Sequence, residues 1–390
     1  MKRILLISVL MLLPCMLLGE TNDEGIILGP FIFKPNFSFV FEHTDNLFLQ
    51  GEKGFNDNLF IIRPTLELVY PFLESSVQIT YVPIWREYQK YNLEHKFSHF
   101  FTFESNIIQS SGLNIKLTDR YVRGFLEVSE IEPQREVVWG TNRFYKNYFG
   151  AEALYDITER INIEAGGDFN YVKFIDREEP LFFYDYNTLT VGGSVGYRMS
   201  PLTNVKVSYR FFNNSAEELY SNRDFRAHQF LFGMESDATP RLKGGFEIGF
   251  ENKQFINSDE SINNLIMSAT LSYEVTEDTR FLLNLDRGTF QSAFLDAVYF
   301  SSTGAAISLT HQFTERLSAT GGGYFQRNAY PETTIDKRKD DIYAFHAEVG
   351  YIISTLAVVH LNYRYEQRNS DLSQYTFHQN RLIFDVLLGW

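Results

Sequence analysis

Charged residues at alternating positions are the part of this sequence with the clearest chemical potential. Between residues 58 and 70, Arg63 and Glu67 alternate with apolar residues such as Phe60 and Ile62. Neighbouring side chains of a β-strand point to opposite faces, so the charged residues would share one face. Such a face predicts a wall that binds polar or anionic solutes through charge-assisted hydrogen bonds. The candidate residues of this wall are Arg63, Glu67, Arg86, Glu104, Lys116, Arg120, Lys206, Arg210, Glu247, Arg364, Arg381 and Asp385.

The histidines do not form the patterns expected of a barrel enzyme. None of the eight has a serine two positions later, and none directly follows an aspartate. A serine nucleophile needs a base within hydrogen-bonding reach, and a metal site needs clustered ligands. The sequence therefore predicts that the protein is not an enzyme and has no catalytic residue, metal site or cofactor.

The chain ends in a segment with one apolar face. Leu382, Phe384, Val386, Leu388 and Trp390 recur at every second position, and the last of them is an aromatic residue that closes the chain. A strand with lipid on one side and water on the other requires this alternation. The five residues also resemble the signal that bacterial barrel-assembly machinery reads, so we predict that this machinery is a partner.

The other end of the chain predicts export from the cytoplasm. Lys2 and Arg3 precede an apolar run over residues 4–18, which is typical of a signal peptide. We predict cleavage after Gly19. A lipoprotein signal that uses Cys15 is the alternative, but Pro14 stands where a small residue is expected. The predicted organisation is a signal peptide at 1–19, a periplasmic N-terminal segment at 20–33 and an outer-membrane barrel at 34–390.

Composition narrows the class further. After the leader no stretch reaches the roughly 20 apolar residues of a membrane-spanning helix, which argues against a helical inner-membrane protein. The 37 Phe, 23 Tyr and only 11 Pro favour long strands. A soluble β-sandwich is the alternative, but its strands average about five or six residues. A formal net charge of −14 argues against nucleic acid as a partner.

Alternating segments predict about eighteen strands, with a range of 16 to 18, and an even number is typical of bacterial barrels. The predicted strands are 34–48, 58–70, 76–91, 97–110, 112–126, 139–156, 160–175, 183–199, 203–213, 224–237, 241–255, 261–275, 279–291, 297–313, 316–329, 340–353, 356–368 and 375–390. Short and long connections alternate between them. The fold class is therefore all-β, a transmembrane antiparallel β-barrel with short periplasmic turns and longer extracellular loops, in the outer membrane of a Gram-negative-type bacterium.

A family resemblance agrees with this interpretation. Pro35 opens the predicted strand 34–48, which ends in Asp45-Asn46 followed by two apolar residues, and Pro64 follows Arg63 within the next strand. This start resembles that of outer-membrane β-barrel porins often encoded among exopolysaccharide genes. The resemblance implies a channel, with exopolysaccharide export across the outer membrane as its function. An outer-membrane barrel would contact outer-membrane lipid and lipopolysaccharide, and export would add a periplasmic polysaccharide-export protein as a partner.

Two hypotheses remain open at this stage. The first is a transport barrel for polar or anionic solutes, either a polysaccharide exporter or a general porin. The second is a non-conducting barrel with a structural or surface-binding role, in which cross-strand ion pairs only brace the wall.

Overall fold

The computed structural model describes residues 20–22, 25–51, 55–91, 93, 96–109, 112–125, 136, 142–175, 183–257, 261–292, 297–331 and 337–389. The predicted signal peptide and Trp390 lie outside the described residues, so the cleavage after Gly19 and the role of Trp390 stay predictions. Within the described ranges, no helix has the length and apolar character that a membrane-spanning helix needs.

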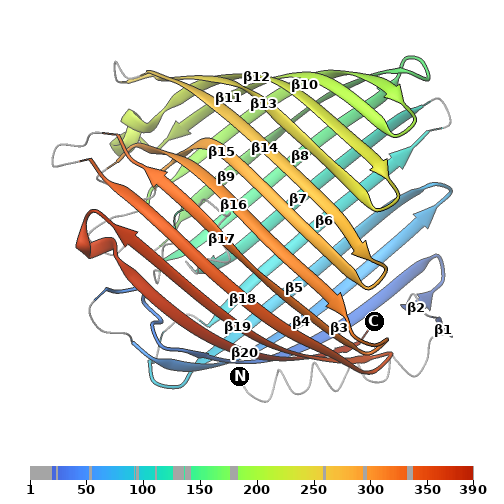
Figure 1. The fold of residues 1–390 in the computed structure, drawn as a ribbon, viewed down its shortest axis with the longest axis vertical. Coiled ribbons are helices and arrows are strands. Elements are labelled where there is room, and N and C mark those ends of the chain that lie inside the picture. The colour runs from blue at the N-terminus through green and yellow to red at the C-terminus, as the bar shows by residue number, and fades with distance from the viewer. Residues whose placement is uncertain are drawn as a thin grey trace.

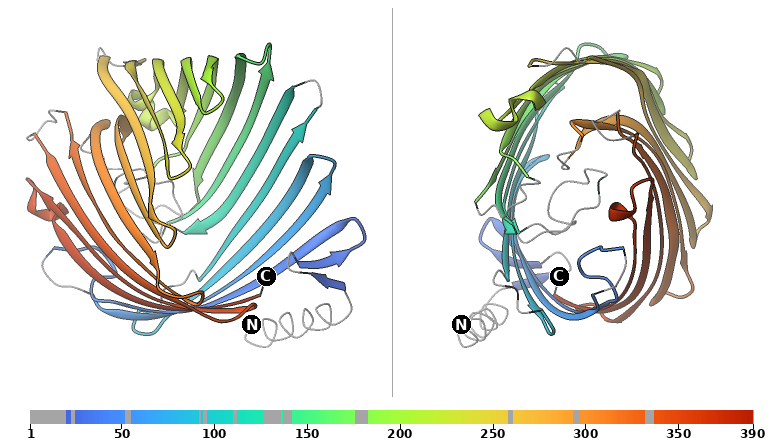
Figure 2. Two further views of the ribbon diagram at one scale, coloured as in Figure 1. Left: turned by 45° about the vertical axis from the view of Figure 1, so that its right-hand side comes forward. Right: turned by 90° about the vertical axis from the view of Figure 1, so that its left-hand side faces the viewer.

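Eighteen long strands of the described chain, β3 to β20, form an antiparallel barrel (Figure 1). Each strand pairs with its neighbours in sequence order, and β20 pairs with β3 to close the ring (Figure 2, right). The strands are β3 (Phe31–Thr44), β4 (Asp57–Phe72), β5 (Ser75–Tyr88), β6 (Phe97–Ile108), β7 (Leu113–Phe125), β8 (Arg143–Asp156), β9 (Ile161–Phe174), β10 (Tyr186–Ser200), β11 (Thr203–Ala216), β12 (Phe225–Thr239), β13 (Leu242–Phe255), β14 (Ser261–Thr276), β15 (Thr279–Gln291), β16 (Tyr299–Gln312), β17 (Leu317–Ala329), β18 (Lys339–Ser354), β19 (Ala357–Ser370) and β20 (Phe377–Gly389).

The predicted fold class is confirmed, and the strand ends differ from the prediction by only a few residues. The first strand differs most instructively. β3 begins at Phe31, ahead of the predicted Lys34, because its first residues pair with a short strand, β2 (Gly25–Leu28), rather than with β20. The still shorter β1 (Glu20–Asn22) pairs with β2. Neither β1 nor β2 was predicted from the sequence.

The connections differ between the two ends of the barrel. Short turns, such as 73–74 between β4 and β5 and 201–202 between β10 and β11, lie at one end, together with the start of β3 and the end of β20. Longer connections lie at the other end, on the left in Figure 1, and two of them contain the 3-10 helices η1 (Glu218–Arg223) and η2 (Ser373–Tyr375). Every second connection is therefore long, as the sequence predicted.

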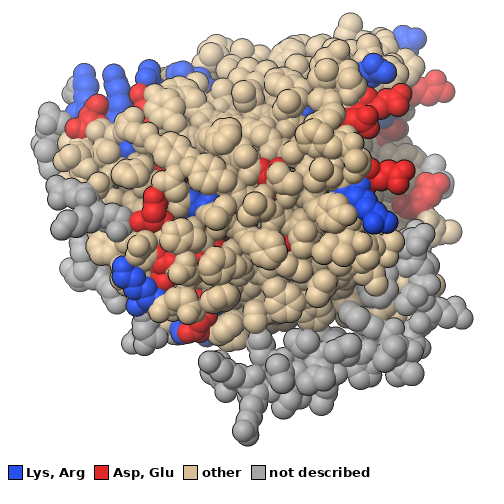
Figure 3. All heavy atoms as spheres, turned by 60° about the horizontal axis from the view of Figure 1, so that its bottom comes forward, with Lys and Arg blue, Asp and Glu red and all other residues tan. Residues whose placement is uncertain are grey.

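The outer surface of the barrel is apolar over its middle. Large hydrophobic side chains at alternate positions, such as Phe60, Leu382 and Phe384, are each 45–46% exposed. Figure 3 shows an outer face that is mostly uncharged across its centre, with Lys, Arg, Asp and Glu concentrated toward both ends. Because exposed aromatic and aliphatic rows are unfavourable in water, this belt matches a hydrocarbon environment.

Candidate functional site

The inner face of the barrel carries charged side chains that are in contact with solvent. Arg120 on β7 and Glu104 on β6 form an ion pair with 3.3 Å between Nη2 and Oε1, yet their side chains remain 58% and 45% exposed. Their nearest outward neighbours, Tyr121 and Phe103, belong to the opposite face of the same strands. Charges in a dry core would be far more buried and fully paired. The interior of the barrel is therefore a hydrated lumen along these strands.

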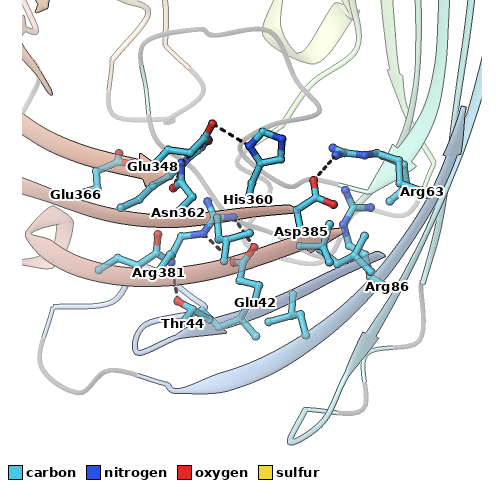
Figure 4. Close-up of a pocket in the computed structure, with 18 of the residues that line it drawn as sticks. Glu42, Thr44, Arg63, Arg86, Glu348, His360, Asn362, Glu366, Arg381 and Asp385 are labelled. Carbon is cyan, nitrogen blue, oxygen red and sulfur yellow. Dashed lines mark hydrogen bonds and ion pairs between the residues drawn. The ribbon is translucent and has the colours of Figure 1, made fainter. Parts of the chain in front are cut away.

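A cavity of about 580 Å³ lies on the inner face where the barrel closes, along β3, β4, β5, β18, β19 and β20 (Figure 4). Its lining combines guanidinium and carboxylate groups with one histidine and a few apolar side chains. The polar and charged residues are Glu42, Thr44, Arg63, Arg86, Glu348, His360, Asn362, Arg364, Glu366, Gln379, Arg381 and Asp385. The alternation of β3, β19 and β20 directs these groups inward while the outward residues form the apolar belt.

Glu42 and Arg381 form the tightest ion pair of the cavity. Arg381 Nε lies 2.7 Å from Glu42 Oε1, and its Nη2 lies 2.8 Å from Oε2. The Glu42 side chain is only 8% exposed, whereas that of Arg381 is 35% exposed. A bidentate guanidinium–carboxylate contact of this kind fixes both side chains and leaves part of the guanidinium facing the lumen.

A second ion pair spans the closing strands. Arg63 Nη2 on β4 lies 3.4 Å from Asp385 Oδ2 on β20. Ser38 on β3, between these two strands, donates to Asp385 Oδ1 at 2.7 Å and accepts from Arg63 Nη2 at 3.2 Å. The three side chains thus connect β4, β3 and β20 from inside the barrel.

Arg364 differs from Arg63 and Arg381 because no carboxylate forms an ion pair with it among the described residues. It lies on β19 directly opposite Arg381 on β20, and its side chain is exposed. Its Nε donates to Asn362 Oδ1 at 3.2 Å. The carboxylates of Glu42, Glu348 and Glu366 act on Arg364 electrostatically, but none of them forms an ion pair with it, so its exposed guanidinium can contact a solute directly.

His360 and Glu348 face the same cavity (Figure 4). His360 Nδ1 lies 3.3 Å from Glu348 Oε1, and Asn362 Nδ2 donates to Glu348 Oε2 at 2.9 Å. The cavity therefore offers carboxylate oxygens and an imidazole beside the arginines. A solute with both an anionic group and hydroxyl groups would find partners for each.

The facing wall of the barrel, on β8 to β13, is lined differently. Inward glycines on β9 and β10 leave shallow space over β8 to β11, including a cavity of about 140 Å³. A Cβ added at Gly166 or Gly192 would lie 2.7 Å from a backbone oxygen of the neighbouring strand. Only glycine fits there without a backbone shift. Few side chains therefore project into the lumen from β9 and β10, and the charged groups of this wall come from the neighbouring strands.

Those charged groups form a local cluster. Lys206 Nζ lies 3.2 Å from Glu247 Oε1 and 3.0 Å from Glu235 Oε1, and Arg210 Nη2 lies 3.2 Å from Glu247 Oε2. The Arg210 side chain remains 40% exposed. This wall thus presents charges that largely neutralise one another.

A buried polar cluster lies among the long connections. Ser292 and Tyr330 donate to Glu136 Oε1 at 2.7 and 2.8 Å, and Arg338 forms a buried pair with Asp340, with 2.6 Å between Nη2 and Oδ2. Burial and the neighbouring Glu136 carboxylate raise the pKa of Tyr330 well above its usual range. The Tyr330 hydroxyl therefore stays protonated and remains a donor.

No arrangement of catalytic groups emerges from the described residues. The string Gly192-Gly193-Ser194-Val195-Gly196 matches the G-x-S-x-G pattern, but it lies inside β10, which is paired continuously with β9. The pattern functions at a strand-to-helix turn, which is missing here. Ser194 instead donates to Glu164 Oε2 at 3.2 Å. In the described part of the chain, no group of three or more His, Cys, Asp or Glu side chains could hold a metal ion.

Comparison with known families decides the identity of the barrel. A model of the family described as "Putative beta-barrel porin 2" matches residues 21–388. The chain belongs to this family. The family resemblance predicted from the sequence is thereby confirmed, whereas its association with exopolysaccharide genes stays a prediction. A comparison with curated proteins found no match.

Solved porin structures share the fold of this family member. OpdK of Pseudomonas aeruginosa, solved with vanillate, has a TM-score of 0.51 at 11% identity over 92% of this chain and 99% of its own. OccK11 (OpdR) of the same organism gives 0.51 at 11% identity over 96% and 100%. A BenF-like porin of Pseudomonas fluorescens Pf-5 gives 0.52 at 11% identity over 92% and 99%. Identities this low establish the fold alone.

The protein is a porin-like outer-membrane β-barrel, and its family and fold are those of channel proteins. The predicted outer-membrane location is confirmed. In such barrels the short turns face the periplasm and the longer loops face the outside. The apolar belt therefore lies in the membrane, and the outer rim lies at the lipopolysaccharide leaflet.

Only some of the predicted wall residues lie together in the large cavity. Arg63, Arg86, Arg364, Arg381 and Asp385 line the large cavity, and Arg86 is buried there, with Nη1 donating to Ser98 Oγ at 3.1 Å. The remaining predicted residues lie elsewhere on the inner face. Glu67 pairs with Lys34 near the periplasmic end, Arg120 with Glu104, Lys206 and Arg210 with Glu247, and Lys116 lines a separate cavity of about 140 Å³.

Glu42, Asn362 and Glu366 are among the polar residues of the cavity that were not candidates from the sequence. The signal for Glu42 was available, because the outward phenylalanines Phe39 and Phe41 place position 42 inward. Asn362 and Glu366 share the inward face of β19 with Arg364, at alternate positions. Alternation could therefore have found all three, although it could not have shown that Glu42 pairs with Arg381 across the closing strands.

Proposed function

We propose that this barrel conducts small polar solutes across the outer membrane and favours those with an anionic group. The observation that carries the proposal is Arg364, an exposed lumenal guanidinium without a carboxylate partner in the described chain, opposite Arg381 on the next strand. A lumenal guanidinium that no carboxylate binds directly raises the local concentration of anions. Exposed charges elsewhere on the inner face, such as Arg120, keep the path hydrated.

The dimensions and donors of the cavity support a solute of modest size. About 580 Å³ lies within the range of sites that hold small organic ligands. OpdK was solved with vanillate, a small carboxylate. For this chain we propose only the class of solute, small organic anions, on the basis of its own arginines and carboxylates.

Flux through proteoliposomes tests the proposal. Vesicles that contain the purified barrel should admit a small carboxylate faster than a neutral sugar of similar size, and replacement of Arg364 by Gln should reduce this preference. Arg280→Gln is the matched control, because Arg280 is a basic residue near the periplasmic end that pairs with Glu274 at 3.6 Å. Equal entry of both solutes in the wild type would contradict the anionic preference.

Exopolysaccharide export is a narrower proposal that comes from the family resemblance alone. A polymer would use the same hydrated lumen, and a periplasmic export protein would deliver it. Loss of surface polysaccharide on deletion of the gene, with restoration by the wild type, would support export over solute uptake. If the barrel proves non-conducting and secretion is unchanged, a structural or surface-binding role remains.

A further inference from the structure

A row of polar side chains crosses the outer surface of four neighbouring strands near their extracellular ends. The strand register places His99 of β6 opposite Arg123 of β7, Arg123 opposite Tyr145 of β8, and Tyr145 opposite Lys173 of β9. These residues share the outward face of the apolar belt. We refer to Arg123, Tyr145 and Lys173 as the basic row.

The basic row lies at the boundary of the apolar belt. Tyr121 on β7 and Tyr171 on β9 each lie two positions nearer the membrane centre than Arg123 and Lys173. Both tyrosines point outward and are exposed. Exposed tyrosines of this kind mark the interface between hydrocarbon and headgroups. Arg123 and Lys173 are the next outward residues toward the long loops. They therefore lie at the depth of the headgroups of the outer leaflet.

The two cations of the basic row are exposed and have no ion pair in the described chain. The Arg123 guanidinium lies 5.5 Å from the centre of the Tyr145 ring, which holds it along the surface. Two other basic groups at the same rim are neutralised. Lys96 Nζ pairs with Glu87 at 2.8 Å, and Arg327 pairs with Asp341 at 2.6 Å.

The partner that fits this geometry is a phosphorylated lipid. Neighbouring strands are about 4.8 Å apart, so side chains on β7 and β9 reach toward each other over roughly 10 Å of surface. Arginine and lysine at that spacing can bind one phosphate group together. Outer-leaflet lipopolysaccharide presents phosphate groups at this depth. In an acidic chain of net charge −14, two basic side chains without ion-pair partners attract these phosphates electrostatically.

We propose that the basic row binds a phosphate group of lipopolysaccharide on the outer wall of the barrel. Arg123 and Lys173 contact the phosphate oxygens, and Tyr145 positions the guanidinium between them. The site is independent of whether the lumen conducts, because all three side chains face away from it.

Lipid retention on the purified barrel tests this site. The wild type, the double variant Arg123→Gln/Lys173→Gln and the control Arg327→Gln/Asp341→Asn are extracted in mild detergent, and bound lipopolysaccharide is measured by native mass spectrometry. We expect the double variant to retain roughly tenfold less lipid, because each basic group at the interface contributes to anionic lipid binding. The control removes a neutral pair at the same rim and should retain as much lipid as the wild type.

Two further arms make the result decisive. Heat-modifiable migration in gels shows that each variant forms the barrel, so that lost lipid cannot reflect lost fold. Titration of delipidated wild type with lipid A, before and after enzymatic removal of its phosphates, separates phosphate recognition from acyl-chain contact. Weaker binding of the dephosphorylated lipid supports the proposal. Equal retention by the double variant, or equal binding of both lipids, would overturn it.

Discussion

The two faces of β20 have different surroundings, although their residues alternate along a single strand. On the outer face, Leu382 and Phe384 are close to half exposed and match the hydrocarbon of the membrane. On the inner face, Arg381 and Asp385 are held by carboxylate, hydroxyl and guanidinium partners from β3 and β4. The effect of a substitution on β20 therefore depends first on whether its face meets lipid or water, and only then on the residue type.

The largest expected effect comes from a charge on the outer face. Phe384→Asp should prevent accumulation of the barrel in the outer membrane, because a lipid-facing carboxylate costs up to about 2 kcal/mol and interrupts the proposed assembly signal. Ile383→Asp, the adjacent residue on the cavity side, is the matched control and should assemble normally. Heat-modifiable protein in outer-membrane fractions measures both. Normal amounts of the Phe384 variant would contradict the assignment of faces.

A smaller effect is expected from a nearly buried charge on the inner face. Glu42→Gln should lower the free energy of unfolding by about 1.5–3 kcal/mol, because Arg381 loses a charge-assisted bidentate partner. The same variant should increase anion selectivity, since Arg381 is then an additional uncompensated cation. Urea unfolding in vesicles gives the first quantity, and reversal potentials in a salt gradient give the second. An unchanged unfolding midpoint would show that the pair contributes nothing to stability.

Arg364→Gln should act on selectivity with little effect on stability, because Arg364 is exposed and lacks a carboxylate partner in the described chain. One unit charge about 4 Å from a passing ion contributes about 1 kcal/mol in water, so the chloride preference should fall roughly fivefold at low salt. Reversal potentials measured beside Arg280→Gln check this. A fall as large in the control would assign the effect to overall charge rather than to the cavity.

The smallest effect is expected at the second ion pair. Asp385→Asn should change the unfolding free energy by less than about 1 kcal/mol, because the Arg63 side chain is 44% exposed and water compensates for the lost contact. Denaturant midpoints of the variant and the wild type measure this difference. A loss as large as that expected for Glu42→Gln would mean that closure of the barrel depends on this pair.

The sequence predicted the barrel because alternation is a local property. Strands such as 279–291 were predicted with the bounds that the structure has, and the outward positions of Phe60 and Leu382 follow from the same pattern. The Pro-containing and Gly-containing segment 25–30 hid the β2 strand, whose pairing with β3 is too short to produce a recognisable pattern.

The cavity could be predicted only in part. Alternation shows that Arg63 and Asp385 point inward, but their contact depends on closure of β20 on β3, which joins residues from opposite ends of the chain. The register of that pairing also lets Glu42 reach Arg381, whereas the separate register of β20 on β19 places Arg364 opposite Arg381. No local periodicity contains this information, so the sequence could give the candidates but not their partners.

Single-channel recording on the purified wild-type barrel in a planar bilayer tests the central proposal most directly. We predict stepwise, long-lived conductance, with a reversal potential in a salt gradient that shifts toward cation preference in Arg364→Gln. Protein that inserts as a heat-modifiable barrel yet passes no current at any voltage would contradict the account and leave a closed, structural barrel.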